Sequence, residues 1–134
     1  MTPLMRKVAF FLFCTVLCLG ACKDTGGYET ISAAKAKELM DAASSYVLLD
    51  VRTEAEFAER HIPGALLLAH TDIKSRAKDV LPDKNVPVFI YCRSGRRSAI
   101  AAKELVGMGY TRVYDFGGIK SWPYDVVSND KNKK

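Results

Sequence analysis

Short apolar runs alternate with stretches of helix-forming residues through most of the chain. A run of about four to eight apolar, β-branched or aromatic residues indicates a strand that is covered on both faces. The pattern predicts such strands over residues 46–50, 65–69, 86–91 and 112–116, and a brief edge strand over 28–31. Helices are predicted between them, over residues 33–43, 54–60, 72–80, 98–106 and 119–127.

Local signals mark where these elements begin and end. Ser32 can cap the first helix, because a serine hydroxyl at this position accepts a backbone N–H of the first turn. Thr53 and Glu56 have the spacing of a capping box, in which each side chain accepts the backbone N–H of the other residue. The pair Gly117-Gly118 predicts the end of the last strand.

Strands that alternate with helices predict βα units. The fold class is therefore α/β, with a mostly parallel central sheet flanked by helices on both faces. We assign one domain to residues 28–127, which is near the common domain size of about 100–150 residues. A polar, basic tail over residues 128–134 follows it.

The first residues have the features of an export signal. Arg6 and Lys7 precede an apolar run over residues 8–19. This run is shorter than the roughly 20 residues that a transmembrane helix needs, and it matches the apolar region of a signal peptide. We therefore expect the segment to direct export.

The residues after this run resemble the lipobox of bacterial lipoproteins, since two small residues precede Cys22. The resemblance implies a signal peptide over residues 1–21, a lipid on Cys22 and a short linker over 22–27. The protein would then be anchored to a membrane and face the periplasm or the cell exterior. The outer membrane is favoured where one exists, because Lys23 and not an aspartate follows the cysteine. A plain secreted protein or an uncleaved anchor is the alternative.

The charge of the chain argues against a nucleic-acid partner. Removing the two basic residues of the signal from the total of 20 leaves 18 against 15 acidic residues, so the net charge falls from +5 to +3. Part of this charge lies in the tail over 131–134. The sequence has no basic stripe interleaved with aromatic residues and no recognition motif, so we expect a solvated tail and no nucleic acid.

The use of cysteine draws attention to Cys92. Cys14 and Cys18 lie in the predicted signal peptide, and Cys22 would carry the lipid. Cys92 is then the one free thiol of the mature protein. Unpaired cysteines are unusual in an oxidising compartment, so Cys92 is either an inert core residue or is kept for its reactivity.

The surroundings of Cys92 favour reactivity. It follows a predicted strand and precedes a predicted helix, and open α/β sheets bind ligands at the carboxyl ends of their strands. Gly95 lets the loop turn so that backbone amides can converge on an anion. Nearby positive charge favours the thiolate over the thiol. The charged residues are Arg93, Arg96 and Arg97, and a solvated patch is the alternative for them, above all for Arg93.

Two groups of cysteine enzymes have active-site loops that resemble this one. Cysteine phosphatases and related arsenate reductases place an arginine six positions after the cysteine, where this chain has Ser98. Arg97 comes one residue early, and the shorter loop would form a smaller cradle, suited to a sulfane sulfur and not to a tetrahedral phosphate. This departure argues against a phosphatase.

The rhodanese family matches better, because its six-residue active loop corresponds to residues 92–97. Other stretches resemble further signatures of the family: Asp50-Val51-Arg52, Glu56-Phe57, His61-Ile62-Pro63-Gly64-Ala65, and Gly117-Gly118 with Trp122. The resemblance covers about residues 28–126 and implies a rhodanese-like domain.

The resemblance implies a sulfurtransferase that moves a sulfane sulfur through a persulfide on Cys92. Its partners would be a donor such as thiosulfate and an acceptor such as cyanide, a thiol or another protein. No metal and no organic cofactor is expected. A non-catalytic rhodanese-like module that binds a partner or carries sulfur is the alternative. The loop that would bind the substrate or persulfide consists of Arg93, Ser94, Gly95, Arg96, Arg97 and Ser98.

Four further residues have structural interpretations that we favour. Asp50 ends a predicted strand and can orient the loop or, as we prefer, pair with Arg52. His61 resembles the family's structural histidine, and His70 is expected at a helix start or on the surface. Trp122 is expected in the core and not in a substrate wall.

Overall fold

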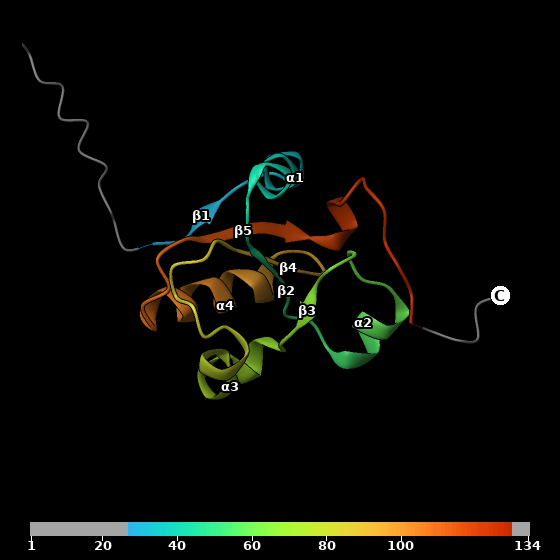
Figure 1. The fold of residues 1–134 in the computed structure, drawn as a ribbon. Coiled ribbons are helices and arrows are strands. Elements are labelled where there is room, and N and C mark those ends of the chain that lie inside the picture. The colour runs from blue at the N-terminus through green and yellow to red at the C-terminus, as the bar shows by residue number, and fades with distance from the viewer. Residues whose placement is uncertain (1–26, 130–134) are drawn as a thin grey trace, which may run out of the picture.

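Five parallel strands form the central sheet of the computed structural model, which describes residues 27–129 (Figure 1). Their order is β1-β5-β4-β2-β3, so that β4 lies in the middle. The predicted α/β fold with a mostly parallel sheet is confirmed. The strands are β1 (Glu29–Thr30), β2 (Val47–Asp50), β3 (Leu66–Leu67), β4 (Val88–Cys92) and β5 (Val113–Gly118).

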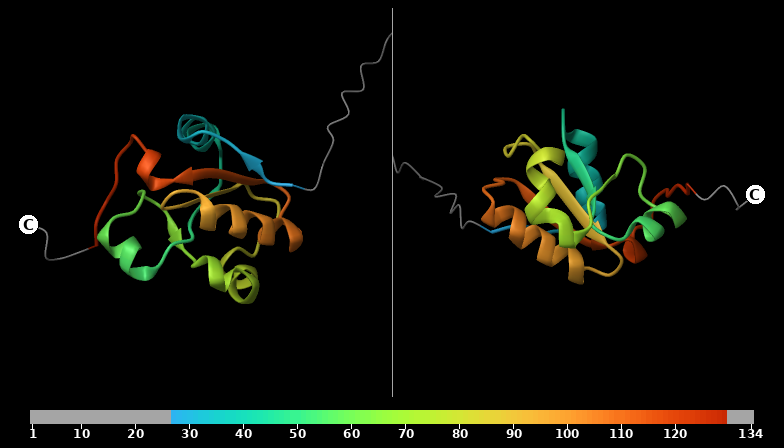
Figure 2. Two further views of the ribbon diagram at one scale, coloured as in Figure 1. Left: turned by 180° about the vertical axis from the view of Figure 1, so that it is seen from behind. Right: turned by 90° about the horizontal axis from the view of Figure 1, so that it is seen from below.

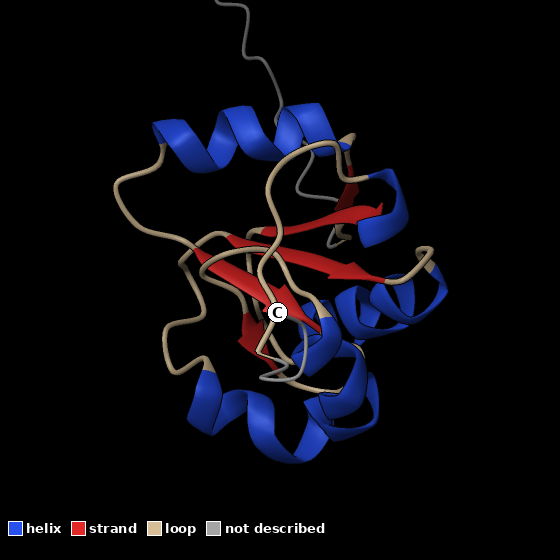
Figure 3. Ribbon diagram, turned by 90° about the vertical axis from the view of Figure 1, so that its right-hand side faces the viewer, coloured by secondary structure: helices blue, strands red, loops and turns tan. Residues whose placement is uncertain are grey.

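Helices cover both faces of this sheet. α1 (Ala33–Ala42) lies on one face, and α3 (Ile73–Val80) and α4 (Arg96–Gly107) lie on the other (Figures 1 and 2). Figure 3 shows the strands between these layers. The short helix α2 (Glu54–Glu59) follows β2. None of the described helices is long and apolar enough to cross a membrane.

Alternation along β4 divides the core into two clusters. Val88, Ile90 and Cys92 pack with α3 and α4, whereas Phe89 and Tyr91 pack with α1. All five side chains are buried, because a parallel sheet with helices on both faces exposes neither surface. The alternation therefore directs Cys92 toward the face on which α4 begins.

The predicted caps are confirmed. The Ser32 hydroxyl accepts the N–H of Lys35 at 3.1 Å and begins α1. At the start of α2, Thr53 Oγ1 accepts the N–H of Glu56 at 3.3 Å, and Glu56 Oε2 accepts the N–H of Thr53 at 3.0 Å. Each bond satisfies a donor that a helix start otherwise leaves without a partner.

The prediction of a last helix over 119–127 is wrong. A single 3₁₀ turn spans Ile119–Ser121, and Trp122 then adopts an extended backbone with φ −83° and ψ 111°. Pro123 explains this, because its ring disfavours a helical conformation of the preceding residue. The chain continues to an isolated antiparallel bridge between His61 and Val127.

The two glycines after Phe116 do not end the last strand as predicted. β5 continues through Gly118, which pairs with Cys92 across a register shift in the β4–β5 ladder. Gly117 takes φ +86°, a conformation that side-chain-bearing residues rarely adopt. The strand expected over 65–69 is also shorter, since β3 contains only two residues.

Candidate active site

Cys92 is the last residue of the central strand β4, at the carboxyl end of the sheet. Its neighbours in the sheet are β2 and β5, and the residue is 1% exposed. α4 begins four residues later, at Arg96, two residues earlier than the sequence pattern suggests. The thiol therefore lies where open α/β sheets usually bind their ligands.

The loop after Cys92 folds back over the sulfur. The backbone N–H of Gly95 donates to Cys92 Sγ at 3.0 Å. Gly95 is the N-cap of α4 and takes φ +111°, which turns the chain sharply enough to aim its amide at the sulfur. The start of α4 adds the positive end of the helix dipole.

Ser98 lies on the other side of the sulfur, in the first turn of α4. It is fully buried, and its Oγ lies 3.6 Å from Cys92 Sγ. The hydroxyl donates to the carbonyls of Gly95, at 3.0 Å, and Gly117, at 3.4 Å. In this state the thiol donates to Ser98, and after ionisation the hydroxyl can rotate to donate to the thiolate.

The balance of these effects lowers the pKa of Cys92. Burial of the thiol opposes ionisation, but hydrogen bonds from the Ser98 hydroxyl and from the amides of Ser98, Gly95 and Ser94 outweigh it. A thiolate is the nucleophilic form of cysteine. The site thus combines a buried sulfur with an environment that stabilises its anion.

Gly118 packs directly against the backbone of this loop at Arg93 and Ser94. A Cβ atom there would lie 2.1 Å from the carbonyl oxygen of Arg93 and 2.6 Å from Cα of Ser94. Its own backbone is ordinary extended strand, with φ −119° and ψ 148°. Glycine is therefore required by the close approach of the loop and not by the conformation of residue 118.

Within residues 27–129, the hydrogen-bond partners of Cys92 Sγ are Ser98 and Gly95 and include no arginine of the loop. Arg97 forms a two-bond ion pair with Glu56, in which Nη1 and Nη2 each donate at 2.8 Å. This guanidinium, together with the caps from Thr53 and against the opposing effect of burial, lowers the pKa of Glu56 to about 2. The pair fastens the first turn of α4 to the start of α2, while Arg93 and Arg96 are exposed.

Asp50 and Arg52 form a second ion pair at the carboxyl end of β2, as the favoured interpretation of the sequence states. Asp50 is fully buried and Arg52 is 3% exposed, and Arg52 Nη2 lies 2.7 Å from Asp50 Oδ2. Arg52 also donates to the carbonyl of Arg60 at 2.6 Å and lies over the ring of Tyr91. The pair joins the end of β2 to the segment after α2, and Asp50 supports the site only indirectly.

His61, His70 and Trp122 have the structural settings that the sequence suggests. His61 is buried, stacks on Phe57 and bonds the carbonyl of Phe57 through Nδ1 at 2.8 Å. His70 begins a 3₁₀ turn, and Trp122 packs against Phe116 in the core. Within residues 27–129, no group of three metal-binding side chains gathers.

Residues 32–124 match the family described as the Rhodanese-like domain. The chain belongs to the rhodanese-like family.

Several relatives of this rhodanese-like chain have names or structures. Thiosulfate sulfurtransferase PspE of Escherichia coli K12 is 39% identical over 72 residues, which cover 54% of this chain and 69% of that protein. Thiosulfate sulfurtransferase GlpE of Coxiella burnetii is 34% identical over 107 residues, covering 79% of this chain and 97% of that protein. A solved structure described as a rhodanese with anions from E. coli is 34% identical, with a TM-score of 0.60, and covers 63% of this chain and 99% of its own.

A pocket of about 310 Å³ borders the Cys92 loop of this rhodanese-like domain. Seven residues line it: Arg52, Glu56, Glu59, Arg60, Arg93, Ile119 and Lys120. They come from the segment after β2, from the loop and from the segment after β5, so they meet at the carboxyl end of the sheet. We refer to this pocket as the mouth.

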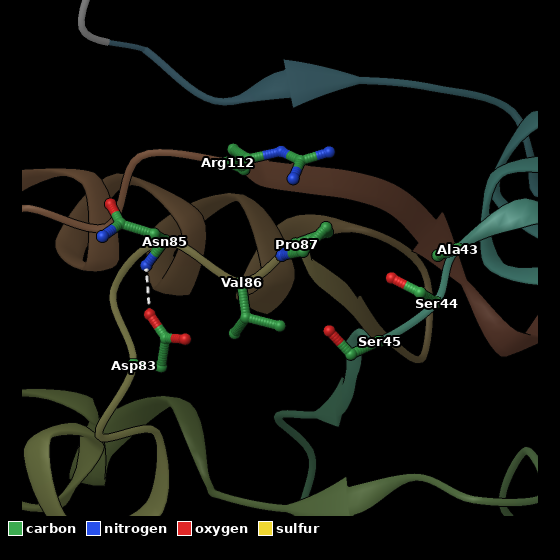
Figure 4. Close-up of a pocket in the computed structure, with 8 residues that line it drawn as sticks. All are labelled: Ala43, Ser44, Ser45, Asp83, Asn85, Val86, Pro87 and Arg112. Carbon is green, nitrogen blue, oxygen red and sulfur yellow. Dashed lines mark hydrogen bonds between the residues drawn. The ribbon is translucent and has the colours of Figure 1, made fainter.

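A second pocket, of about 280 Å³, lies at the opposite end of the strands (Figure 4). Its residues directly precede β2, β4 and β5, and they include Ser45, Pro87 and Arg112. The dashed line in Figure 4 marks the bond from the N–H of Asn85 to Asp83, at 2.8 Å. This pocket is remote from Cys92.

Sequence reasoning missed two features of the site. It explained Glu56 by the capping box alone, although the same carboxylate also holds Arg97, 41 residues away along the chain. It interpreted Gly118 as a strand end, although this residue also packs against the backbone of the Cys92 loop. Both contacts join distant segments, and only the family signature around Gly117-Gly118 hinted at either.

Proposed function

We propose that this protein is a rhodanese-type sulfurtransferase in which Cys92 carries the sulfur between a donor and an acceptor. The observation that carries the proposal is the cradle around Cys92 Sγ, with the Gly95 amide at 3.0 Å, Ser98 Oγ at 3.6 Å and a lowered pKa. A buried thiolate that needs no neighbouring base is suited to attack a sulfane sulfur.

The first step loads the enzyme. The Cys92 thiolate attacks the outer sulfur of a donor such as thiosulfate, the S–S bond of the donor breaks, and sulfite leaves with the electron pair of that bond. The product is a Cys92 persulfide, whose outer sulfur carries negative charge. In the proposed site the amides of residues 94, 95 and 98 stabilise this charge, because they are already oriented before the reaction.

The second step unloads it. A nucleophilic acceptor such as cyanide or a thiol attacks the outer sulfur, the Cys92 S–S bond breaks, and Cys92 leaves as a thiolate. Thiocyanate or an acceptor persulfide is the product. The resting enzyme is regenerated without a metal, a cofactor or an external oxidant.

The relatives support this reading of the geometry. Two of them are named thiosulfate sulfurtransferases, and the solved rhodanese of E. coli is described with anions. The structure also weighs against phosphate chemistry. Arg97 is paired with Glu56, and the residue six positions after Cys92 that faces the sulfur is Ser98 and not an arginine.

Incubation of the mature domain with thiosulfate and cyanide tests the proposal. Thiocyanate should form, and the intact mass should increase by about 32 Da before cyanide is added, as a covalent intermediate requires. Cys92→Ala should lose both signals. Uptake of sulfur without turnover would favour a sulfur carrier, and hydrolysis of an aryl phosphate would favour a phosphatase.

We further propose that the enzyme acts as an exported lipoprotein anchored through Cys22, which lies outside the described residues. The support is the lipobox-like sequence that ends at Cys22. Labelling of the host with a fatty-acid analogue should mark the wild-type protein, and Cys22→Ser should release it from the membrane fraction. An unlabelled wild-type protein would contradict the anchor.

A further inference from the structure

The mouth beside the Cys92 loop has an excess of unpaired positive charge. Two of its charged residues are engaged elsewhere, since Arg52 pairs with Asp50 and Glu56 pairs with Arg97. The side chains of the others have no ion-pair partner within residues 27–129. These are Arg60, Arg93, Lys120 and Glu59, so three cations face one carboxylate.

Backbone hydrogen bonds fix the positions of Lys120 and Arg60 in the wall of this pocket. The backbone N–H of Lys120 donates to the carbonyl of Arg93 at 3.4 Å, which places the two residues side by side. The backbone carbonyl of Arg60 accepts a hydrogen bond from Nη2 of the buried Arg52 at 2.6 Å, which ties Arg60 to the Asp50–Arg52 pair. The three charges therefore come from separate segments whose backbones are anchored around one pocket.

We propose that the mouth selects an anionic organic thiol, bearing one or more carboxylates, as the sulfur acceptor. This inference rests on the proposed sulfur transfer and assigns Arg60 and Lys120 as specificity-determining residues. A volume of about 310 Å³ is at the lower end of the range of roughly 300–1,000 Å³ that organic ligands occupy. Clustered cations raise the local concentration of anions.

The depth of Cys92 leaves most of an acceptor molecule outside the cradle, beside the mouth that Arg93 of the loop helps to line. Cys92 is 1% exposed, so a donor must bring its sulfane sulfur down to the base of the cradle. A persulfide extends the side chain by one S–S bond, about 2 Å. The acceptor needs to reach only this outer sulfur, and in the proposed arrangement the rest of its molecule occupies the mouth.

The step itself balances. The acceptor thiolate attacks the outer sulfur of the Cys92 persulfide and forms a new S–S bond. The old S–S bond breaks, Cys92 keeps its electron pair as a thiolate, and the outer sulfur becomes the terminal sulfur of the acceptor persulfide and keeps its negative charge. No oxidant or reductant is consumed, and the carboxylates of the acceptor take no part in the bond changes.

A series of thiols that differ in charge tests the proposal. The protein is first loaded with thiosulfate and freed of excess donor, and its persulfide is then discharged with 2-mercaptoethanol, 3-mercaptopropionate or mercaptosuccinate. Rates are compared per thiolate at one pH by intact mass. Mercaptosuccinate should react about tenfold faster than 2-mercaptoethanol, and 0.5 M NaCl should reduce this advantage.

Two charge-reversed proteins complete the test. The double variant R60E/K120E, compared with the wild type after both are loaded with sulfur to the same extent, should lose most of the advantage of mercaptosuccinate over 2-mercaptoethanol. Arg112→Glu is the control, because Arg112 is an exposed arginine at the far end of the strands (Figure 4), and its selectivity should equal that of the wild type. Equal rates for all three thiols, or an advantage that survives in R60E/K120E, would overturn the proposal.

A binding measurement separates this inference from the proposed function. Succinate, which has no thiol, should shift the backbone amide NMR signals of Arg93 and Lys120 in the unloaded protein, and R60E/K120E should abolish these shifts. If Cys92 took up no sulfur, the sulfurtransferase proposal would fail while this binding could still be observed. If sulfur loaded normally and succinate shifted neither amide, the mouth proposal alone would fail.

Discussion

The two ends of the parallel sheet carry pockets of nearly equal size but very different chemistry. The mouth measures about 310 Å³ and the pocket at the amino ends about 280 Å³, and each contains exposed arginine. Only the carboxyl end adds a buried nucleophile, a loop whose amides point at it and a helix start. A cavity and a positive charge are thus insufficient to make a site. The two ends differ because only the loop after β4 directs backbone N–H groups at a buried side chain.

The largest difference between the two ends should appear in glycine substitutions. Gly118→Ala places a Cβ atom against the backbone of Arg93 and Ser94, so the loop must move and its amides leave the sulfur. We expect sulfur uptake to fall by roughly a hundredfold or more, which is the effect of losing a preorganised donor. Intact-mass kinetics after addition of thiosulfate measure it.

Gly107→Ala is the matched change, since Gly107 ends α4 near the amino ends of the strands and has open space around its Cα. It should leave uptake unchanged. Normal sulfur uptake by Gly118→Ala would show that the position of the loop does not depend on its close contact with Gly118.

Loss of a buried carboxylate should separate the two ends in stability. Asp50→Ala leaves the guanidinium of Arg52 buried without its partner, which should cost about 3–5 kcal/mol of unfolding free energy. Asp83→Ala at the amino end removes an exposed carboxylate that accepts one amide, and should cost less than about 1 kcal/mol. Urea denaturation compares them, and equal losses would contradict the assignment.

A smaller effect is expected from the serine beside the sulfur. Ser98→Ala removes the hydroxyl that helps to lower the pKa of Cys92, so the thiolate forms at higher pH. Loss of one hydrogen bond to a charged group, about 1.5 kcal/mol, should move the pH–rate profile toward higher pH and slow uptake roughly tenfold on the acidic limb of that profile. Ser45→Ala, in the opposite pocket, should move neither, and an unshifted profile for Ser98→Ala would exclude this role.

The smallest effect concerns acid stability at the carboxyl end. The pKa of Glu56 lies at about 2, below its ordinary value of 4.5, chiefly because of Arg97. The stabilisation from this pair is therefore complete above pH 4.5 and is lost as the pH falls from there toward 2. Glu56→Gln should be less stable at neutral pH and should show a flatter decline of unfolding free energy between pH 4.5 and 2.5. Parallel curves for the two proteins would contradict the pairing.

Much of the fold could be predicted because local patterns agree with the final structure. The run that becomes β4 is apolar throughout and ends at Cys92, and the capping box begins α2 where its spacing indicates. The parallel sheet followed from the alternation of strands and helices. The cysteine and its loop could be recognised because they are contiguous in sequence.

The remaining features depend on contacts between distant segments. The pattern did not show that Arg97 turns to Glu56, nor that Gly118 lies beneath the loop, because each partner is remote in sequence. The sequence pattern predicts a last helix over residues 119–127, and Pro123 prevents it. The periodicity of apolar residues indicates which side chains are buried. The hydrogen-bonding loop around Cys92 depends instead on which residues those buried side chains contact.

The pairing of β1 with β5 has a consequence for how the chain folds. Glu29 lies opposite Tyr114 and Thr30 opposite Asp115, so nearly the whole domain separates the two strands. Contacts at such separation form late, because the entropy of closing a long loop opposes them. A chain that is still being synthesised and has not yet reached residues 113–118 offers β1 no strand to join. Completion of the sheet, and with it the arrival of Gly118 under the Cys92 loop, therefore waits for the C-terminal part of the domain.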